Sequence, residues 1–83
     1  VTITSPQNNE TVRGKFTVTV DLSGFEGLTT VKYIVDGKLI ITTQNSPYDV
    51  SMIPGKFSKG QHTLVVEVSD ANNFATDSIV FRR

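Results

Sequence analysis

The sequence contains no cysteine and no tryptophan, and its eight basic residues balance its eight acidic ones. Without cysteine the chain forms no disulfide and offers no thiolate metal ligand, which leaves its redox compartment open. Without a net positive charge it lacks the electrostatic footprint of a protein that binds nucleic acid or an anionic membrane. No apolar run approaches the roughly 20 residues of a membrane span, and no signal-peptide pattern occurs. We therefore expect no nucleic-acid partner and no membrane insertion.

The length of 83 residues fits one domain, which we expect to span residues 1–83. The chain opens directly on a strand pattern and closes without a tail, so we interpret it as a domain cut from a larger multidomain protein. A chain this short buries only about 60 to 65% of the surface that its unfolded form exposes, so its core must be simple.

Alternation of apolar and polar residues is the dominant pattern. Between Phe16 and Leu22 every second residue is apolar, as in a strand with one buried face. Shorter runs rich in β-branched residues predict further strands at Val1–Ile3, Val31–Val35, Leu39–Ile41, Tyr48–Val50, Leu64–Val68 and Ile79–Phe81. No stretch keeps a helical period, so we expect no helix of consequence.

The segment TTVKYIVDGKLIITT predicts a hairpin. Asp36-Gly37 separates two apolar runs, and this pair suits a type I′ turn, which needs positive φ at both central positions. The apolar positions of the two runs are Val31, Tyr33, Val35, Leu39 and Ile41.

Seven short strands separated by turn residues predict an all-β fold, an immunoglobulin-like antiparallel β-sandwich of about seven strands. If successive strands run antiparallel, the odd count places the two ends of the chain at opposite poles, roughly 25 Å apart. This arrangement is typical of a bead on a string or a rigid spacer.

The sequence resembles the bacterial immunoglobulin-like domains over nearly its whole length. The resemblance rests on VTITSPQNNETVRG, FTVTV, VKYIVDGKLI, SPYDVS and GQHTLVVEVSDANNFATDS, whose turns and core positions have the spacing of that family. It implies a non-catalytic spacer or protein-interaction module of a larger extracellular or cell-surface protein. Accessory domains of carbohydrate-active, cell-wall or proteolytic enzymes are of this kind. The partners implied are neighbouring domains of the same chain, another protein or a polysaccharide, with no enzyme activity and no cofactor.

The stretch VSDANNFATDS raises the question of a calcium loop. A helix-flanked calcium loop that starts at Asp70 needs an oxygen ligand at its fifth position and Glu at its twelfth, where this chain has Phe74 and Phe81. Asp and Asn also cap turns by bonding their own backbone. We therefore predict a turn without a metal. Asp77 falls on the inward phase of the last strand, where we expect it to find a backbone partner or the sandwich rim.

Two further candidate chemistries are weak. His62 is the only histidine, no G-x-S-x-G elbow accompanies it, and we expect it to be a partly exposed residue at a strand start. The alternative to a spacer is a carbohydrate-binding module, which needs exposed aromatic platforms. Tyr33 and Tyr48 fall on the apolar phase and predict core positions, so only loop phenylalanines remain for such a role.

Two surfaces are candidates for protein contact. If the apolar phase of the long strands faces inward, four aliphatic residues face outward as one patch: Ile34, Ile40, Val65 and Val80. The loops at residues 23–28, 44–47 and 71–74 should meet at the pole where the chain begins, with Phe25 and Phe74 as neighbours. Either both rings plug the sandwich, or Phe25, flanked by Gly24 and Gly27, projects and docks on a preceding domain.

Overall fold

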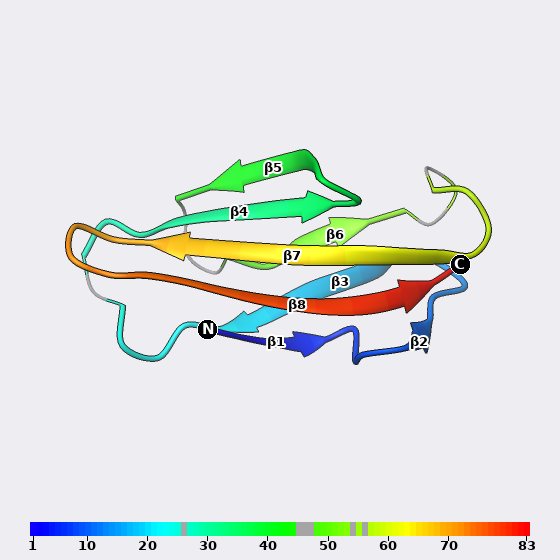
Figure 1. Ribbon diagram of the computed structural model, residues 1–83, viewed down its shortest axis with the longest axis horizontal. Coiled ribbons are helices and arrows are strands. Elements are labelled where there is room, and N and C mark those ends of the chain that lie inside the picture. Colours follow the sequence, from blue (N-terminus) through cyan, green and yellow to red (C-terminus); the bar gives the residue numbers. More distant parts are fainter. Residues whose placement is uncertain (26, 45–47, 54, 56) are drawn as a thin grey trace.

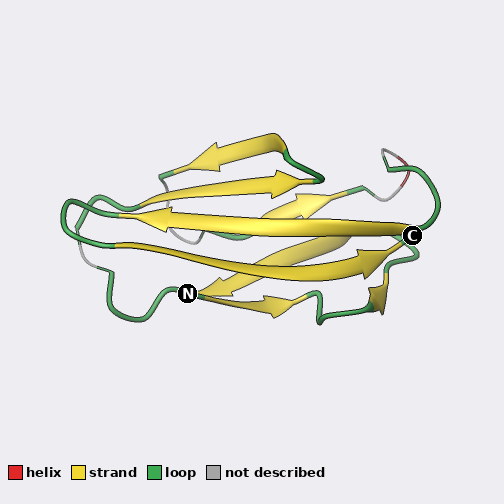
Figure 2. Ribbon diagram, viewed as in Figure 1, coloured by secondary structure: helices red, strands yellow, loops and turns green. Residues whose placement is uncertain are grey.

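The computed structural model describes residues 1–25, 27–44, 48–53, 55 and 57–83. It shows a β-sandwich of two sheets, which confirms the predicted fold class (Figures 1 and 2). One sheet has the order β1-β3-β6 and the other the order β2-β8-β7-β4-β5. The strands are β1 Thr2–Ser5, β2 Glu10–Thr11, β3 Phe16–Asp21, β4 Thr30–Val35, β5 Lys38–Thr43, β6 Val50–Met52, β7 Gln61–Ser69 and β8 Phe74–Arg82.

The strand β2 corrects the expected count and the expected alternation of direction. It is an eighth strand, and it pairs parallel with β8, with Glu10 opposite Phe81. The chain changes sheets between β1 and β2, because Pro6, which has no N–H to donate, ends the pairing of β1 with β3. Both residues of β2 are exposed, so no apolar alternation marks it in the sequence.

The predicted hairpin is confirmed, with an irregularity that the sequence does not reveal. Asp36 and Gly37 have φ of 52° and 81°, as a type I′ turn requires. The register between β4 and β5 shifts, so that Tyr33 faces Ile41 whereas Ile34 faces Leu39. The extra residue, Ile40, is a β-bulge that turns part of β5 over.

The core lies between the sheets and uses the predicted alternation. Tyr33, Leu64 and Phe81 are its largest fully buried side chains. Its other buried apolar members are Ile3, Val12, Val18, Val31, Val35, Met52, Val66, Val68 and Ile79. Tyr48 packs against this cluster, and its carbonyl accepts a hydrogen bond from the Tyr33 hydroxyl. Burial raises the pKa of Tyr33 to about 12, so this hydroxyl stays a donor at neutral pH.

The body measures 38 × 20 × 18 Å, and the strands run along its length (Figure 1). The chain leaves at one end, called here the C-terminal pole, with the Asp36-Gly37 turn and the β6–β7 connection beside it. The β3–β4 connection, the β5–β6 connection and the β7–β8 turn meet at the other end, the N-terminal pole. Val1 lies in the half of the body that ends at this pole. The predicted clustering of these loops is confirmed for their described residues, and residues 45–47 lie outside the described part.

Candidate functional site

The two phenylalanines of the N-terminal pole have the reverse of the exposure expected for docking by Phe25. Phe25 is half-buried and packs against the core cluster, and its N–H bonds to the Leu22 carbonyl in a tight turn. Phe74, at the first position of β8, is 67% exposed. The β7–β8 turn fixes the backbone of Phe74, but the ring of Phe74 lies on the face of β8 that points away from the core. The prediction that Phe25 projects from its loop is therefore wrong.

The Asp70 loop is a turn, as predicted. Asp70 Oδ1 accepts hydrogen bonds from the N–H groups of Asn72 at 2.8 Å and Asn73 at 2.7 Å, and the Asp70 N–H donates to the Asn73 carbonyl. The carboxylate thus organises its own loop. Among the residues that the structure describes, no group of three acidic or histidine side chains is placed to hold a metal.

The outer aliphatic patch has four members, as expected, but one of them differs from the prediction. Ile34 and Val65 are cross-strand partners on β4 and β7, both half-exposed, and Val80 lies diagonally from Val65 on β8. Ile40 does not share this face, because the bulge turns it toward depressions lined by Val35 and Met52. Leu39, opposite Ile34 and 52% exposed, takes its place.

His62 is a buried polar side chain near the C-terminal pole, and the expectation that it would be partly exposed is wrong. It is 6% exposed because it enters the core phase of β7 and stacks on Phe81 at 5.5 Å between ring centroids. Its Nδ1 lies 2.6 Å from Asp36 Oδ2, and its Nε2 lies 2.7 Å from the Ser58 carbonyl oxygen. Both partners are acceptors, so both nitrogens donate only when the ring is protonated.

His62 and Asp36 each shift the pKa of the other in the direction that favours its charged form. The hydrogen bond to Asp36 and then the Ser58 carbonyl raise the pKa of His62 above its ordinary value. The bond from His62 and then the Thr63 N–H lower the pKa of Asp36. Because the Ser58 carbonyl occupies Nε2, the ring nitrogen that would have to take a proton from a nucleophile, the geometry suits a structural ion pair rather than a general base.

The prediction that Asp77 bonds a backbone group is confirmed. Its Oδ2 accepts the N–H of Ile3 on β1 at 2.8 Å, although the two residues belong to different sheets. The carboxylate thus links the first and last strands across the side of the sandwich.

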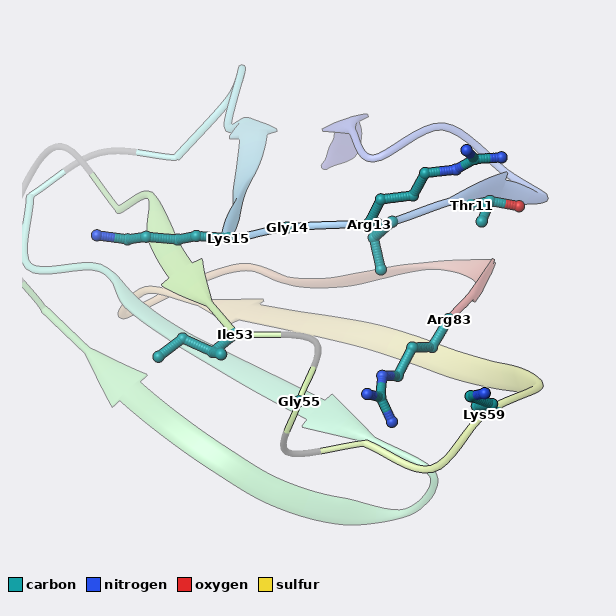
Figure 3. A pocket seen from close by; sticks show the side chains of 9 residues that line it. Thr11, Arg13, Gly14, Lys15, Ile53, Gly55, Lys59 and Arg83 are labelled. Carbon is teal, nitrogen blue, oxygen red and sulfur yellow. The ribbon is translucent and has the colours of Figure 1, made fainter.

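A depression with a volume of about 490 Å³ lies at the C-terminal pole, and sequence reasoning missed it. Arg13 and Lys15 lie along one side, on the β2–β3 connection, and Lys59 and Arg83 lie on the other (Figure 3). Ile53 adds an apolar side chain to the lining of this depression. Arg83 Nη1 donates to the Phe57 carbonyl at 2.8 Å, which holds this guanidinium in place. The net charge of zero hides this cluster of cations. Assigning each charged residue to a pole from the expected strand directions would have revealed it.

Glycan recognition has little support on this surface. Stacking platforms need exposed, flat rings, and Phe74 is the one exposed aromatic side chain among the described residues.

Within the described part of the chain, no helix is long and apolar enough to cross a membrane.

Comparison with known proteins gives two findings. The sequence profile described as "Bacterial Ig domain" matches residues 1–66. A solved structure of fibronectin(III)-like modules of CbhA from Clostridium thermocellum is similar in fold, with a TM-score of 0.75 over 99% of this chain and 93% of that one, at 23% identity. No curated protein sequence matches the chain.

Proposed function

The chain belongs to the bacterial immunoglobulin-domain family, and we propose that it serves as a non-catalytic spacer or protein-interaction module of a larger extracellular protein. An accessory domain beside a carbohydrate-active, cell-wall or proteolytic enzyme is the setting that fits best. The observation that carries the proposal is the placement of the two chain ends in opposite halves of a 38 Å body whose interior is filled by side chains.

The filled interior supports a mechanical role. Nine-residue strands β7 and β8 pair along their whole length and span most of the long axis, so the two poles are joined by one continuous ladder. Backbone hydrogen bonds all along this ladder resist bending between the ends. A neighbour attached at each pole would therefore be held at a fixed separation.

The test compares this domain with a flexible linker in the parent protein. Spin labels in the two flanking domains should give a narrow distance distribution by double electron–electron resonance. Replacement of residues 1–83 by an 83-residue Gly/Ser linker should broaden it severalfold, because such a linker behaves as a random coil. Equally broad distributions in both proteins would rule out the spacer role.

Carbohydrate binding is the second candidate, and the exposure of Phe74 is the observation in its favour. One ring supplies about 1 to 3 kcal/mol at most when it packs against a flat ligand, so a single platform predicts weak binding. Retention of the domain on insoluble polysaccharide, lost on Phe74→Ala, would support this candidate.

A further inference from the structure

The charges of this neutral chain are separated along its long axis. Among the described lysines and arginines, Lys32 alone lies in the middle of a long strand. The others lie at or beside the C-terminal pole: Arg13, Lys15, Lys38, Lys59, Arg82 and Arg83. In the 83-residue chain, Glu10, Asp36 and the terminal carboxylate of Arg83 offset three of these six positive charges. The C-terminal pole is therefore basic although the sequence has no net charge.

The N-terminal pole has the opposite sign. The carboxylates of Asp21, at the end of β3, and Asp70, directly after β7, lie towards it, together with the ammonium group of Val1, which acts on Asp21. The hydroxyl and N–H of Ser23 lower the pKa of Asp21, which keeps this carboxylate ionised at neutral pH. Charges of opposite sign are thus separated along the long axis of a body 38 Å in length.

The poles also differ in shape. The basic pole is hollowed by the depression of about 490 Å³, where Ile53 offers an apolar surface between cations. The acidic pole presents two prominent apolar side chains, Leu28 at 73% exposure and Phe74 at 67%. An apolar projection with carboxylates around it complements an apolar hollow with cations around it.

We propose that copies of this chain associate end to end, with the acidic pole of one copy against the basic depression of the next. The contact is heterologous, since two different surfaces meet, so it leaves a free pole at each end and extends into a row. The proposal concerns the chain alone and holds or fails whether or not the domain is a spacer in its parent protein.

A second copy explains more of the surface than an anionic polymer does. A polyanion would use the cations of one pole and would leave the carboxylates and apolar side chains of the other pole without a role. The cations also do not converge on one point, because Arg13 and Lys15 extend in different directions and Arg83 is held by the Phe57 carbonyl (Figure 3). Such a spread suits a broad surface of opposite charge.

The expected association is weak. The end face measures about 20 by 18 Å, well below the roughly 800 Å² per partner of a standard stable interface. Exposed ion pairs contribute little each and are screened within about 10 Å at 0.1 M salt. Contacts between free copies should therefore form at millimolar protein and low salt, and tethering copies in one chain would strengthen them through effective concentration.

The test uses the 83-residue chain and amide chemical shifts recorded at 0.05 and 1 mM protein in 10 mM NaCl. Concentration-dependent shifts should appear at both poles, be absent from the centres of β4 and β7, and vanish in 500 mM NaCl. Lys15→Glu should reduce them at least threefold. Lys32→Glu makes the same change of net charge away from the poles and should leave them at half or more of the original size.

A mixed sample provides a second readout. Asp21→Lys alone should also suppress the shifts, whereas an equimolar mixture with Lys15→Glu should restore them, because the intact acidic pole of one variant meets the intact basic pole of the other. Absence of concentration-dependent shifts in the unmodified chain would overturn the proposal. So would equal effects of Lys15→Glu and Lys32→Glu, or polyphosphate shifts at the basic pole without any self-association.

Discussion

The two poles of this sandwich use aspartate in different ways. At the N-terminal pole, Asp21 and Asp70 bond groups two and three residues away in their own turns. At the C-terminal pole, Asp36 bonds His62 and Thr63, which are 26 and 27 residues away. The first kind of contact shapes a loop, and the second joins two parts of the fold. The C-terminal pole should therefore depend more on long-range packing, and more on pH near neutrality, than the N-terminal pole.

The most damaging change should be Phe81→Ala at the C-terminal pole. Phe81 is fully buried and lies within 5.6 Å, between ring centroids, of Phe16, Phe57 and His62. Loss of a buried phenylalanine costs about 3 to 5 kcal/mol, which is most of the stability of a small domain. Urea unfolding should show a variant that is largely unfolded at 37 °C. A loss below 1 kcal/mol would show that the aromatic cluster does not hold this pole.

At the N-terminal pole the corresponding change is Phe25→Ala. Phe25 is half-buried, so we expect a loss of about 1 to 2 kcal/mol in the unfolding free energy. Phe74→Ala is the matched control, because its ring is 67% exposed and its removal should stay within about 0.5 kcal/mol. Equal losses in the two variants would contradict the assignment of Phe25 to the core.

The third prediction concerns pH. The pKa of His62 is raised above 6.5 on folding, so its contribution is complete below pH 6.5 and is lost as pH rises through the raised value. The pKa of Asp36 is lowered below 3.8, so its contribution is complete above pH 3.8 and is lost as pH falls through the lowered value. Between these limits the pair stabilises most. Because Asp36 is half-exposed, we expect a loss of only about 1 kcal/mol between pH 6 and pH 9.

The substitution Asp36→Asn isolates this effect. Asparagine tolerates the positive φ of the turn and can still accept from the Thr63 N–H, but its neutral amide cannot support a protonated His62. The alkaline loss of stability, measured by urea unfolding, should shrink to less than half. Asp49→Asn, which lies outside this pair, is the control. Parallel pH profiles for Asp36→Asn and the unmodified chain would refute the ion pair.

The smallest expected effect is that of calcium on the N-terminal pole. Asp70 Oδ1 already accepts two backbone N–H groups, so the loop needs no cation to hold its shape. The melting temperature in chelator and in 2 mM calcium should agree within 1 °C. A rise of several degrees with calcium would reveal a metal site there.

The sequence predicts the fold well because its strands have one buried face each. The alternation from Phe16 to Leu22 and the Asp36-Gly37 turn are local patterns, and both appear in the structure. The bulge at Ile40 and the strand β2 are not predictable in this way, because they arise from pairing with distant strands. The partners of His62 and the basic depression also depend on which loops meet at a pole. Of the two alternatives for the phenylalanines, the core position fits Phe25 and docking by Phe25 is wrong, because glycine spacing indicates loop freedom but not the direction of a ring. Phe74 is exposed, contrary to the alternative in which both rings plug the sandwich.

The bond from the Ile3 N–H to Asp77 has a consequence for aggregation. β1 is an edge of the three-stranded sheet, and edge strands offer N–H groups on which another chain can add a strand. The Asp77 carboxylate already accepts the Ile3 N–H within the same molecule. A foreign strand that took this N–H would leave the charge of Asp77 without that partner. The carboxylate therefore disfavours the addition of a strand to β1. β5, an edge of the five-stranded sheet, presents Leu39, Ile40 and Ile41 in succession, each more than 40% exposed, and is where uncontrolled strand addition would begin.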